Sequence, residues 1–269
     1  MKVAGQLRDR ISTLIKWWRL VGVRSTLRWN LIRVCQVLGI GEPKRWRVRP
    51  HHVLYTLTAR LRGSSDMRVF WQIFTSDEYS SLRNLENVSL VLDLGANVGY
   101  SSAYFLSCFP AARVVAVEPD ERNVAICRIN LNPYGDRVLL LHGAVWPEST
   151  YLSLSKCTAG NGLEWARQVT QPPVGGVGDV QAWDVGSLID MSGGTKVDLL
   201  KVDIERAELA VFGYSATTWL PRVRNICIEL HGADCQETFF NALAGFDYEL
   251  EHSGELTICR NIRPSTVTH

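Results

Sequence analysis

The amino-terminal part of the chain shows the three- and four-residue spacing of apolar side chains that is typical of amphipathic helices. Basic residues separate the apolar positions of the first stretch, which are Leu7, Ile11, Leu14, Ile15 and Trp18. A second stretch sets three apolar positions among arginines, namely Leu27, Leu31 and Val34. We therefore predict a helical segment here, then a turn-rich linker at 39–50 and further helix over 51–85.

From residue 89 onward, short apolar runs alternate with helical periodicity, which is typical of a parallel sheet covered on both faces. The runs predict strands at 89–94, 113–117, 138–141, 197–202 and 225–230. Helices are predicted at 100–108, 120–131 and 236–244. Two closing strands, at 248–251 and 256–259, are separated by a short turn and predict an antiparallel edge. We expect an α/β fold with a Rossmann-like, mostly parallel sheet.

This pattern divides the chain into three parts. We predict a basic, amphipathic helical segment at 1–62, a ligand-binding α/β domain at 63–262 and a tail at 263–269. The stretch 158–178 is rich in glycine and proline and lacks periodicity. It predicts either a loop over the mouth of a pocket or a disordered insert.

Charge separates the first part from the rest of the chain. Residues 1–62 hold 14 Lys and Arg against Asp9 and Glu42, a net charge of +12. The whole chain carries +2, so the remaining residues carry −10. A basic arm predicts an anionic partner, either a membrane surface or a nucleic acid. Its apolar stripe fits either an interfacial helix pair, with Trp17, Trp18 and Trp29 at the headgroups, or a helical cap packed on the domain.

Other features of the composition exclude several classes of protein. No apolar run reaches the ~18 residues of a transmembrane helix. Arg8 and Arg10 interrupt any signal-peptide core, so we expect a cytoplasmic protein, at the inner face of the membrane if the arm binds lipid. The seven cysteines are scattered without a C-x-x-C pair, which favours free thiols over zinc or disulfides.

The strongest chemical signal is the run from Asp93 to Tyr100, between the first predicted strand and helix. Its turn contains Gly95, Asn97 and Gly99, which lets the backbone approach a ligand closely. Asp93 precedes the glycines and would repel a pyrophosphate, whereas it can accept a hydrogen bond from the ammonium of a methionine moiety. The run therefore favours S-adenosylmethionine over a dinucleotide as the cofactor. We expect Asp93, Gly95, Asn97, Gly99 and Tyr100 all to lie in the cofactor pocket.

Two later strand ends complete the expected cofactor pocket. Glu118 follows the glycine turn by ~20 residues, where a carboxylate is expected to bind the ribose hydroxyls. Gly143 and Ala144 follow the third strand, where small residues can flank an adenine ring.

The fourth and fifth strands end in residues suited to the methyl acceptor. Lys201, Asp203 and Glu205 alternate along the chain, so we expect them on one face, crowded at the carboxyl edge. Repulsion between Asp203 and Glu205 would raise one pKa and create a base. His231 at the next strand end is a further candidate base. Asp203, Glu205 and Glu229 can bind Mg²⁺, but their spacing is not specific, and we predict no metal site.

Several blocks of this sequence, in this order, resemble the FkbM-type methyltransferases. They are Asp93 to Gly99 (D-x-G-A-N-x-G), Glu118-Pro119, and the run from Lys201 to Glu208 (K-x-D-x-E-x-A-E). Further matches are Asn130 with Asn132, Trp183-Asp184 and Ile228 to His231, and the resemblance covers about residues 70–260. It implies a class I methyltransferase fold, S-adenosylmethionine as cofactor, and O-methylation of a sugar or polyketide-type hydroxyl.

Arg206 stands where the family pattern has glycine. This departure concerns the part of the site that binds the methyl acceptor more than the part that binds the cofactor. If that glycine serves a positive φ, Arg206 costs local strain or marks a different acceptor. Three further functions are considered. The basic arm keeps an RNA-modifying methyltransferase as an alternative, and Arg206 is the best argument for a non-catalytic protein with a degenerate pocket. A nicotinamide-dependent dehydrogenase is disfavoured by Asp93 and by the missing third glycine. Asn132-Pro133-Tyr134 resembles a nucleobase amino-methylation motif but lies before the third strand, so we interpret it as a turn. We expect a small-molecule or glycan hydroxyl acceptor, with membrane contact through residues 1–40 as a further possibility and nucleic acid less favoured.

Overall fold

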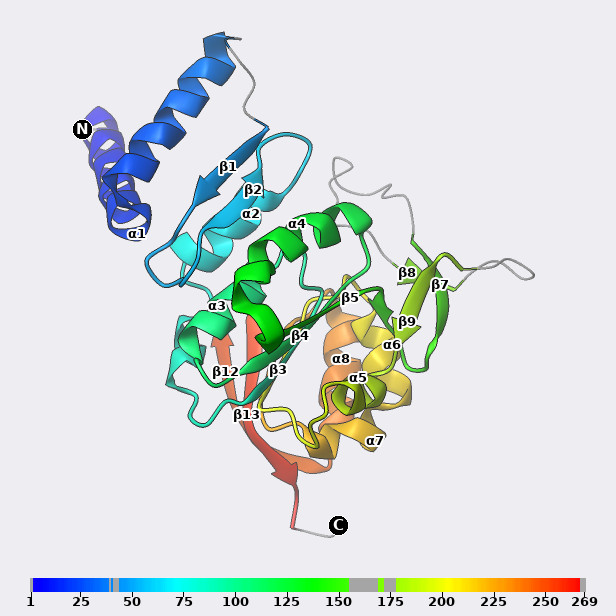
Figure 1. Cartoon of the computed structure of the whole chain (residues 1–269). Coiled ribbons are helices and arrows are strands. Elements are labelled where there is room, and N and C mark those ends of the chain that lie inside the picture. Colours follow the sequence, from blue (N-terminus) through cyan, green and yellow to red (C-terminus); the bar gives the residue numbers. More distant parts are fainter. Residues whose placement is uncertain (1, 39, 41–43, 155–168, 172–177, 267–269) are drawn as a thin grey trace.

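The computed structural model describes residues 2–38, 40, 44–154, 169–171 and 178–266, and it places helices on both sides of a central sheet (Figure 1). The α-helices are α1 (Lys2–Leu38), α2 (Asp66–Phe70), α3 (Tyr100–Cys108), α4 (Glu121–Leu131), α5 (Val185–Met191), α6 (Glu208–Tyr214), α7 (Ala216–Trp219) and α8 (Ala233–Ala242). Shorter helical turns are η1 (Trp71–Thr75), η2 (Ser80–Asn84), η3 (Asn132–Arg137) and η5 (Leu220–Arg222). The strands of the central sheet are β3 (Leu90–Leu94), β4 (Arg113–Glu118), β5 (Val138–His142), β10 (Leu199–Val202), β11 (Ile226–Glu229), β12 (Phe246–Ser253) and β13 (Leu256–Pro264).

The central sheet has the strand order β12-β13-β11-β10-β3-β4-β5. The five strands from β11 to β5 are parallel to one another, and β13 is antiparallel to both β11 and β12. This confirms the predicted α/β fold with a mostly parallel sheet and an antiparallel pair at one edge. Within that pair, β12 is the outermost strand, and β13 lies between it and β11.

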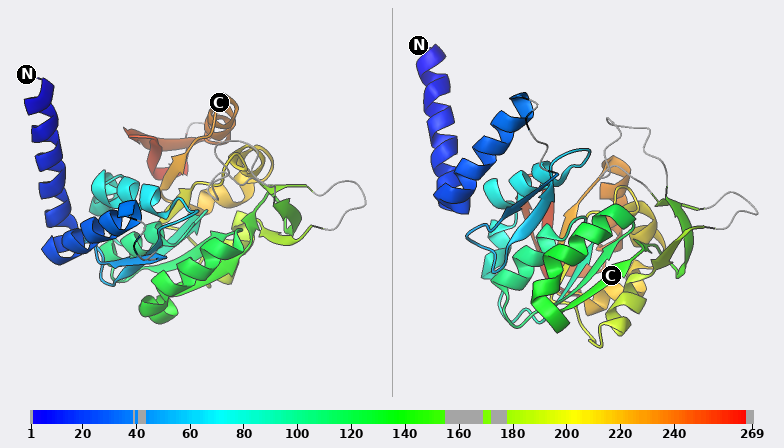
Figure 2. Two further views of the ribbon diagram at one scale, coloured as in Figure 1. Left: turned by 90° about the horizontal axis from the view of Figure 1, so that it is seen from above. Right: turned by 45° about the horizontal axis from the view of Figure 1, so that its top comes forward.

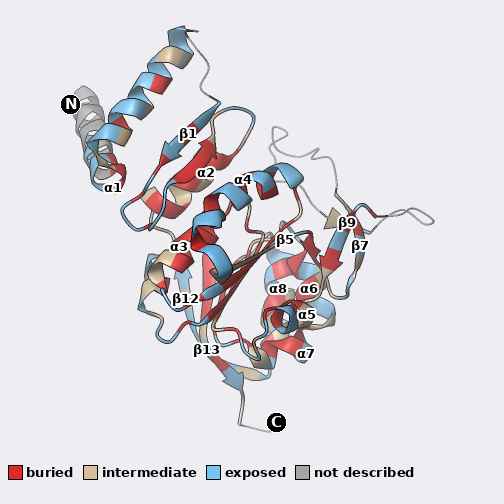
Figure 3. Cartoon of the chain, viewed as in Figure 1, coloured by how far each residue is buried: buried red, intermediate tan, exposed pale blue. Residues whose placement is uncertain are grey.

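Both faces of the sheet are buried, which explains the continuous apolar runs of its strands. All five residues of β3 are buried, and they alternate between two cores. Val91 faces α3 and α4, whereas Leu90 and Leu92 face α5 to α8. Figure 3 shows this buried centre in red beneath helices whose outer faces are exposed.

A second, smaller sheet adjoins the end of β5 and was not expected from the sequence. Its strands are β6 (Ala144–Val145), β7 (Thr150–Leu154), β8 (Val169–Thr170) and β9 (Val180–Trp183), in the order β6-β9-β7-β8. The loop predicted at 158–178 falls largely outside the described residues, because only 169–171 and 178 of it are described.

The expected linker and the helix predicted after it are partly wrong. Residues 45–60 form an antiparallel pair, β1 (Arg45–Val48) and β2 (Leu57–Arg60), in place of linker and helix. The strand pattern is present in Arg45-Trp46-Arg47-Val48, where the two apolar side chains are buried and the two arginines are exposed. Helix begins only at α2.

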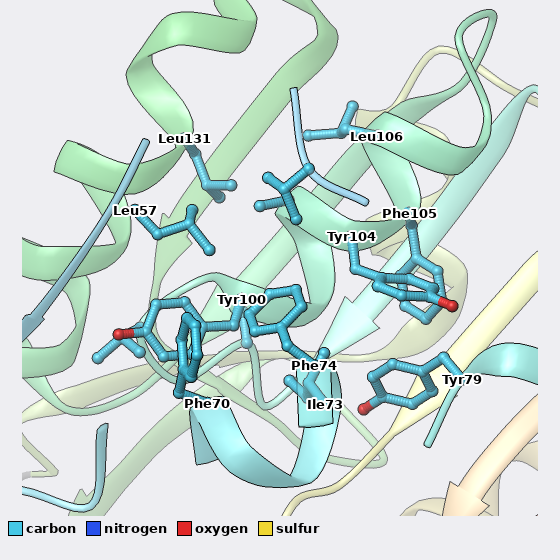
Figure 4. Close-up of a cluster of buried hydrophobic side chains, with 14 of the residues drawn as sticks. Leu57, Phe70, Ile73, Phe74, Tyr79, Tyr100, Tyr104, Phe105, Leu106 and Leu131 are labelled. Carbon is cyan, nitrogen blue, oxygen red and sulfur yellow. The ribbon is translucent and has the colours of Figure 1, made fainter. Parts of the chain in front are cut away.

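The segment from α2 to η2 packs against α3 through aromatic side chains (Figure 4). Phe70 and Phe74 both lie edge-on to Tyr100, with ring centroids 5.8 and 5.9 Å away. Tyr79 packs against Tyr104 at 5.7 Å. This packing places α2 and η1 beside the glycine turn that precedes α3.

Helix α1 is bent at Gly22, whose φ of 77° and ψ of 161° are not helical. Its first half projects away from the rest of the molecule (Figure 2). Around the bend, Trp17 stacks on Trp29 and packs against Trp46 and Trp71. Trp17 and Trp29 therefore join the domain, as expected of a helical cap, whereas Trp18 is exposed.

Two further expectations concern the membrane and the cysteines. In the described part of the chain, no helix combines the length and the apolar composition needed to cross a bilayer. The cysteines that the structure describes are all free thiols.

Candidate active site

A pocket lies where the parallel strands of the central sheet end at one edge. Residues from five consecutive strand ends line it: Gly95 after β3, Glu118 in β4, Gly143 after β5, Asp203 after β10, and Glu229 and His231 at the end of β11. The segment formed by α2 and η1 lines the opposite side. In open parallel sheets, ligands bind at this edge.

The glycine turn lies directly against the backbone that follows β10. Gly95 has a φ of +79°, and a Cβ built there would be 1.8 Å from the backbone oxygen of Asp203. Gly99 has a φ of +81°, and its Cβ would be 2.8 Å from the Cys127 sulfur. Both positions require glycine, because an added side chain has neither a favourable conformation nor space. Gly95 lines the pocket, whereas Gly99 packs against α4 and is not among the lining residues.

Asn97 and Glu118 are joined across the pocket floor. The Asn97 backbone N–H donates to Glu118 Oε2 at 2.9 Å. Glu118 Oε1 accepts from the Asp120 N–H and the Asn123 side-chain amide, at 3.0 and 3.1 Å. Burial raises the pKa of Glu118 to about 7, against the effect of these donors. A carboxylate oxygen has two lone pairs, so Glu118 keeps capacity to accept from a hydroxyl.

Asp93 lies beneath the glycine turn and does not line the pocket. It is fully buried, and its Oδ2 accepts from the Ser101 and Ser102 hydroxyls. Its Oδ1 is 3.2 Å from Lys201 Nζ, because β3 and β10 pair these two residues in register. Lys201 Nζ also donates to the Gly95 carbonyl at 2.7 Å. In this structure Asp93 holds the turn in place through Lys201, in place of the predicted direct contact with a methionine ammonium.

Tyr100 and Ala144 are both buried residues that line the pocket. The buried Tyr100 side chain lines the pocket, and its hydroxyl donates to the Thr58 carbonyl at 3.1 Å. Ala144 in β6 is a buried lining residue beside Gly143. A Cβ on Gly143 would be 2.3 Å from the Trp183 ring, so this wall is tightly packed.

His231 is surrounded by four carboxylates at the other end of the pocket. Its Nδ1 is 3.0 Å from Oε1 of the fully buried Glu208. Its Nε2 is 3.8 Å from Asp203, 3.8 Å from Glu205 and 3.7 Å from Glu229. The structure thus brings together all three predicted catalytic residues, although Glu205 lies in a turn after β10 with a φ of 51°. We call Asp203, Glu205, Glu208, Glu229 and His231 the acid–histidine cluster.

The pKa values in this cluster reflect burial and mutual charge. Burial raises the pKa of Glu205 to about 7 and that of Glu229 to about 7, with Asp203 adding repulsion to both. Burial opposes the charged form of His231, but the hydrogen bond to Glu208 and the other carboxylates outweigh it and raise its pKa to about 9. His231 is therefore an imidazolium at neutral pH, and the carboxylates are the groups positioned to accept a proton. Asp203, Glu205 and His231 also lie close enough together to share a cation.

Several pocket residues were missed by the sequence analysis. Arg68 in α2, Gln72 in η1 and Glu78 before η2 line the pocket, and Gln72 donates to Glu78 at 2.9 Å. Local periodicity gives no signal for them, because their role depends on how α2 and η1 pack on α3. A charged residue such as Glu78 within an aromatic-rich stretch was the available hint.

Arg206 adopts the conformation for which glycine is suited. Its φ is +75°, so the departure from the family pattern carries backbone strain. Its guanidinium points away from the pocket, where it donates to the His231 carbonyl at 2.9 Å and pairs with Asp234. Arg206 therefore ties the turn after β10 to the turn after β11, which carries the His231 ring.

The residues present fit S-adenosylmethionine. Asn97 Oδ1 is a buried acceptor with no hydrogen-bond donor among the described residues, and it belongs to a residue that lines the pocket. An ammonium is a suitable donor for such an oxygen. Glu118 is available for ribose hydroxyls, and the Gly143–Ala144 wall offers an apolar surface for a flat ring.

Comparisons with known proteins agree with this assignment. The family model described as the methyltransferase FkbM domain matches residues 93–248. The AMB antimetabolite synthetase AmbE of Pseudomonas aeruginosa is 27% identical over 71% of this chain, and the matched part is 11% of AmbE. This chain therefore spans only a small part of that curated relative.

Solved structures are also similar to this chain, at low identity and with TM-scores below 0.5. The precorrin-6y C5,15-methyltransferase of Geobacter metallireducens GS-15 has a TM-score of 0.41 and is 13% identical to this chain. The alignment covers 72% of this chain and 89% of the precorrin-6y methyltransferase chain. The S-adenosylhomocysteine-bound methyltransferase PaMTH1 of Podospora anserina has a TM-score of 0.40 and is 17% identical to this chain. The alignment covers 73% of this chain and 79% of the PaMTH1 chain. At this level of similarity neither structure informs the choice of substrate. The match over residues 93–248 confirms the predicted family: this chain belongs to the FkbM-domain methyltransferases, whose cofactor is S-adenosylmethionine.

Proposed function

We propose that this methyltransferase transfers its methyl group to a hydroxyl of a sugar, glycan or other secondary-metabolite-type acceptor. The observation that carries the proposal is the acid–histidine cluster at the end of the pocket away from Glu118. Here Glu205 and Glu229 have pKa values raised to about 7, which suits proton transfer at neutral pH.

The cofactor side supports the same assignment. Asn97, Glu118 and Ala144 would hold S-adenosylmethionine, with the backbone of Gly95 against it. When bound, this cofactor supplies an electrophilic methyl group on a sulfonium. The chain's own contribution is to align an acceptor oxygen with that group, and such alignment can supply ~7–11 kcal/mol.

The charge of the cluster favours oxygen over nitrogen as the acceptor atom. A hydroxyl remains neutral beside carboxylates and must lose its proton as the new C–O bond forms. Glu205 or Glu229 can take that proton, while His231 stays charged and holds the carboxylates together. An amine beside the same carboxylates would be stabilised as an ammonium, which has no lone pair with which to attack.

An RNA substrate and a degenerate, non-catalytic pocket both receive less support from the residues present. Glu78, Glu255 and the cluster give the acceptor side a negative charge, which opposes a phosphate backbone and disfavours RNA. Arg206 points outward and is not among the lining residues, so it does not fill the pocket in the way a degenerate site would require.

Matched acceptors test the proposal directly. The protein is incubated with S-adenosylmethionine and with pairs such as glucose and glucosamine, then with larger glycans and polyketide-type alcohols. Release of S-adenosylhomocysteine and the mass of the product are measured. We expect methylation on oxygen, and we expect Glu205→Gln combined with Glu229→Gln to lower kcat by about 10²-fold while cofactor affinity is unchanged. Methylation on nitrogen, or full activity in this double variant, would overturn the proposal.

A further inference from the structure

The second half of α1, residues 23–38, carries apolar side chains on two different faces. One face packs on the domain through Thr26, Trp29 and Ile32, with Trp29 5.0 Å from Trp46 between ring centroids. Exposed apolar residues lie on the other face, and they include Val23, Leu27, Leu31, Val34 and Leu38. Leu27 and Leu31 are 61% and 63% exposed.

These five exposed residues form one continuous stripe. Their spacing of four, four, three and four residues keeps them within a narrow sector of a helix that turns every 3.6 residues. We call these five residues the outer stripe. In Figure 3 this half of α1 is mostly exposed, with buried positions among the exposed ones. Contiguous exposed apolar surface of this kind marks an interaction site.

The charged residues around the outer stripe are basic. Residues 10–41 contain no Asp or Glu, and their basic residues are Arg10, Lys16, Arg19, Arg24, Arg28 and Arg33. Arg24, Arg28 and Arg33 are exposed. At the periodicity of a helix, Arg24 and Arg28 flank the outer stripe, whereas Arg33 lies nearer the face that packs on the domain. Strand β1, which packs on the inner face of α1 through Trp46, also carries exposed arginines, Arg45 and Arg47.

We infer that the outer stripe and its arginines bind the surface of an anionic lipid bilayer. An apolar stripe enters the acyl boundary while arginines at its sides reach the headgroups, which is the design of an interfacial helix. A nucleic acid would place phosphates against the apolar stripe. A second copy would bring two sets of arginines together. The inner contact with Trp46 holds the stripe outward, so binding needs no detachment of the helix.

Vesicle flotation with the full chain tests this inference. The vesicles contain phosphatidylcholine alone, or phosphatidylcholine with phosphatidylglycerol, at low salt. We expect binding to the anionic vesicles to exceed binding to the neutral ones by about ten-fold or more. Leu27→Gln with Leu31→Gln should reduce it by about ten-fold, and Arg24→Gln with Arg28→Gln should reduce both the binding and its salt dependence.

The matched control replaces exposed apolar residues elsewhere, Tyr214→Gln with Leu250→Gln, and should bind as the wild type does. Equal thermal unfolding of all variants shows that they are folded. Wild-type protein that ignores anionic vesicles overturns the inference, as does binding that survives loss of the two leucines. Binding to duplex RNA without vesicle binding, or a dimer that Leu27→Gln with Leu31→Gln dissociates without vesicle binding, overturns it too.

Discussion

A side chain at Gly95 would have to enter space already occupied by the backbone that follows β10. Gly63 also has a positive φ, but a Cβ built there has no atom within 4 Å. A substitution at Gly63 therefore measures the cost of the backbone conformation alone. We expect Gly63→Ala to cost about 1 kcal/mol of unfolding free energy. Gly95→Ala should cost a further 1–3 kcal/mol, as overpacking does, and weaken cofactor binding. Denaturant unfolding measures both, and equal costs at the two positions would contradict the packing described for the glycine turn.

Arg206 allows backbone strain to be separated from side-chain contacts. Arg206→Ala removes the contacts with Asp234 and the His231 carbonyl but keeps the positive φ, whereas Arg206→Gly removes both the contacts and the strain. We expect Arg206→Gly to be more stable than Arg206→Ala by about 1 kcal/mol, the difference expected of glycine in this conformation. Equal unfolding free energies for the two variants would show that no strain is stored there.

The raised pKa of His231 predicts how the stability of the protein depends on pH. Its folded pKa of about 9 exceeds the ordinary value of 6.5, so the folded state retains a proton that the unfolded state loses between these pH values. This stabilisation is complete below pH 6.5 and is lost as the pH rises to about 9, by on the order of 3 kcal/mol. Denaturant unfolding at pH 6, 7.5 and 9 measures it.

The variants Glu208→Gln and His231→Asn provide the comparison for this pH dependence. Glu208→Gln removes the hydrogen bond that raises the pKa, so the loss should be smaller and centred at lower pH. His231→Asn should remove the part of the loss that falls between pH 7.5 and 9, whereas Glu118, Glu205 and Glu229, whose pKa values are also raised to about 7, still contribute to the loss below pH 7.5. A wild-type slope that persists unchanged in His231→Asn would assign the effect to another group.

At the scale of secondary-structure elements, the amino-terminal part depends on Trp46 in β1. This side chain is fully buried against Trp17, Trp29 and Phe70. We expect Trp46→Ala to cost about 3–5 kcal/mol and to expose the tryptophans of α1. The exposed Trp18 is the matched control, and Trp18→Ala should cost little. Unfolding free energy and tryptophan fluorescence measure the two variants, and similar small costs would contradict the packing of α1 on the hairpin.

The strands that could be predicted from the sequence are those that are buried on both faces of the sheet. Strands such as β3 and β4 are covered on both faces, so they read as continuous apolar runs. The β1–β2 pair was missed because its exposed positions are arginines within a basic stretch that also fits a helical interpretation. The small sheet from β6 to β9 was missed because its strands are short.

The site was predictable in outline and less so in detail. Strand ends place Gly95, Glu118, Asp203 and His231 at one edge, and sequence order alone indicates this. The pairing of Asp93 with Lys201 depends on the register of β3 and β10, which no local pattern specifies. The role of Glu208 depends on its burial beneath His231, which is a tertiary property.

At the scale of the whole molecule, the separation of charge predicted from the sequence corresponds to a separation in space. The outer stripe and its arginines belong to α1, which stands beside the β1–β2 hairpin (Figure 1), whereas the acid–histidine cluster lies at the edge of the central sheet. An anionic surface therefore attracts the arm and repels the acceptor side of the pocket, which gives the molecule a preferred orientation at such a surface.

The central claim, that the turn from Gly95 to Gly99 and Glu118 form an S-adenosylmethionine pocket, is tested most directly by calorimetric titration. The purified protein is titrated with S-adenosylmethionine and with NAD, beside Glu118→Ala and the exposed matched control Glu121→Ala. We expect S-adenosylmethionine to bind and NAD not to bind. Glu118→Ala should weaken binding by about ten-fold or more, because charge-assisted hydrogen bonds to the ribose are lost, and Glu121→Ala should bind normally. Absence of S-adenosylmethionine binding, or affinity unchanged in Glu118→Ala, would contradict the account.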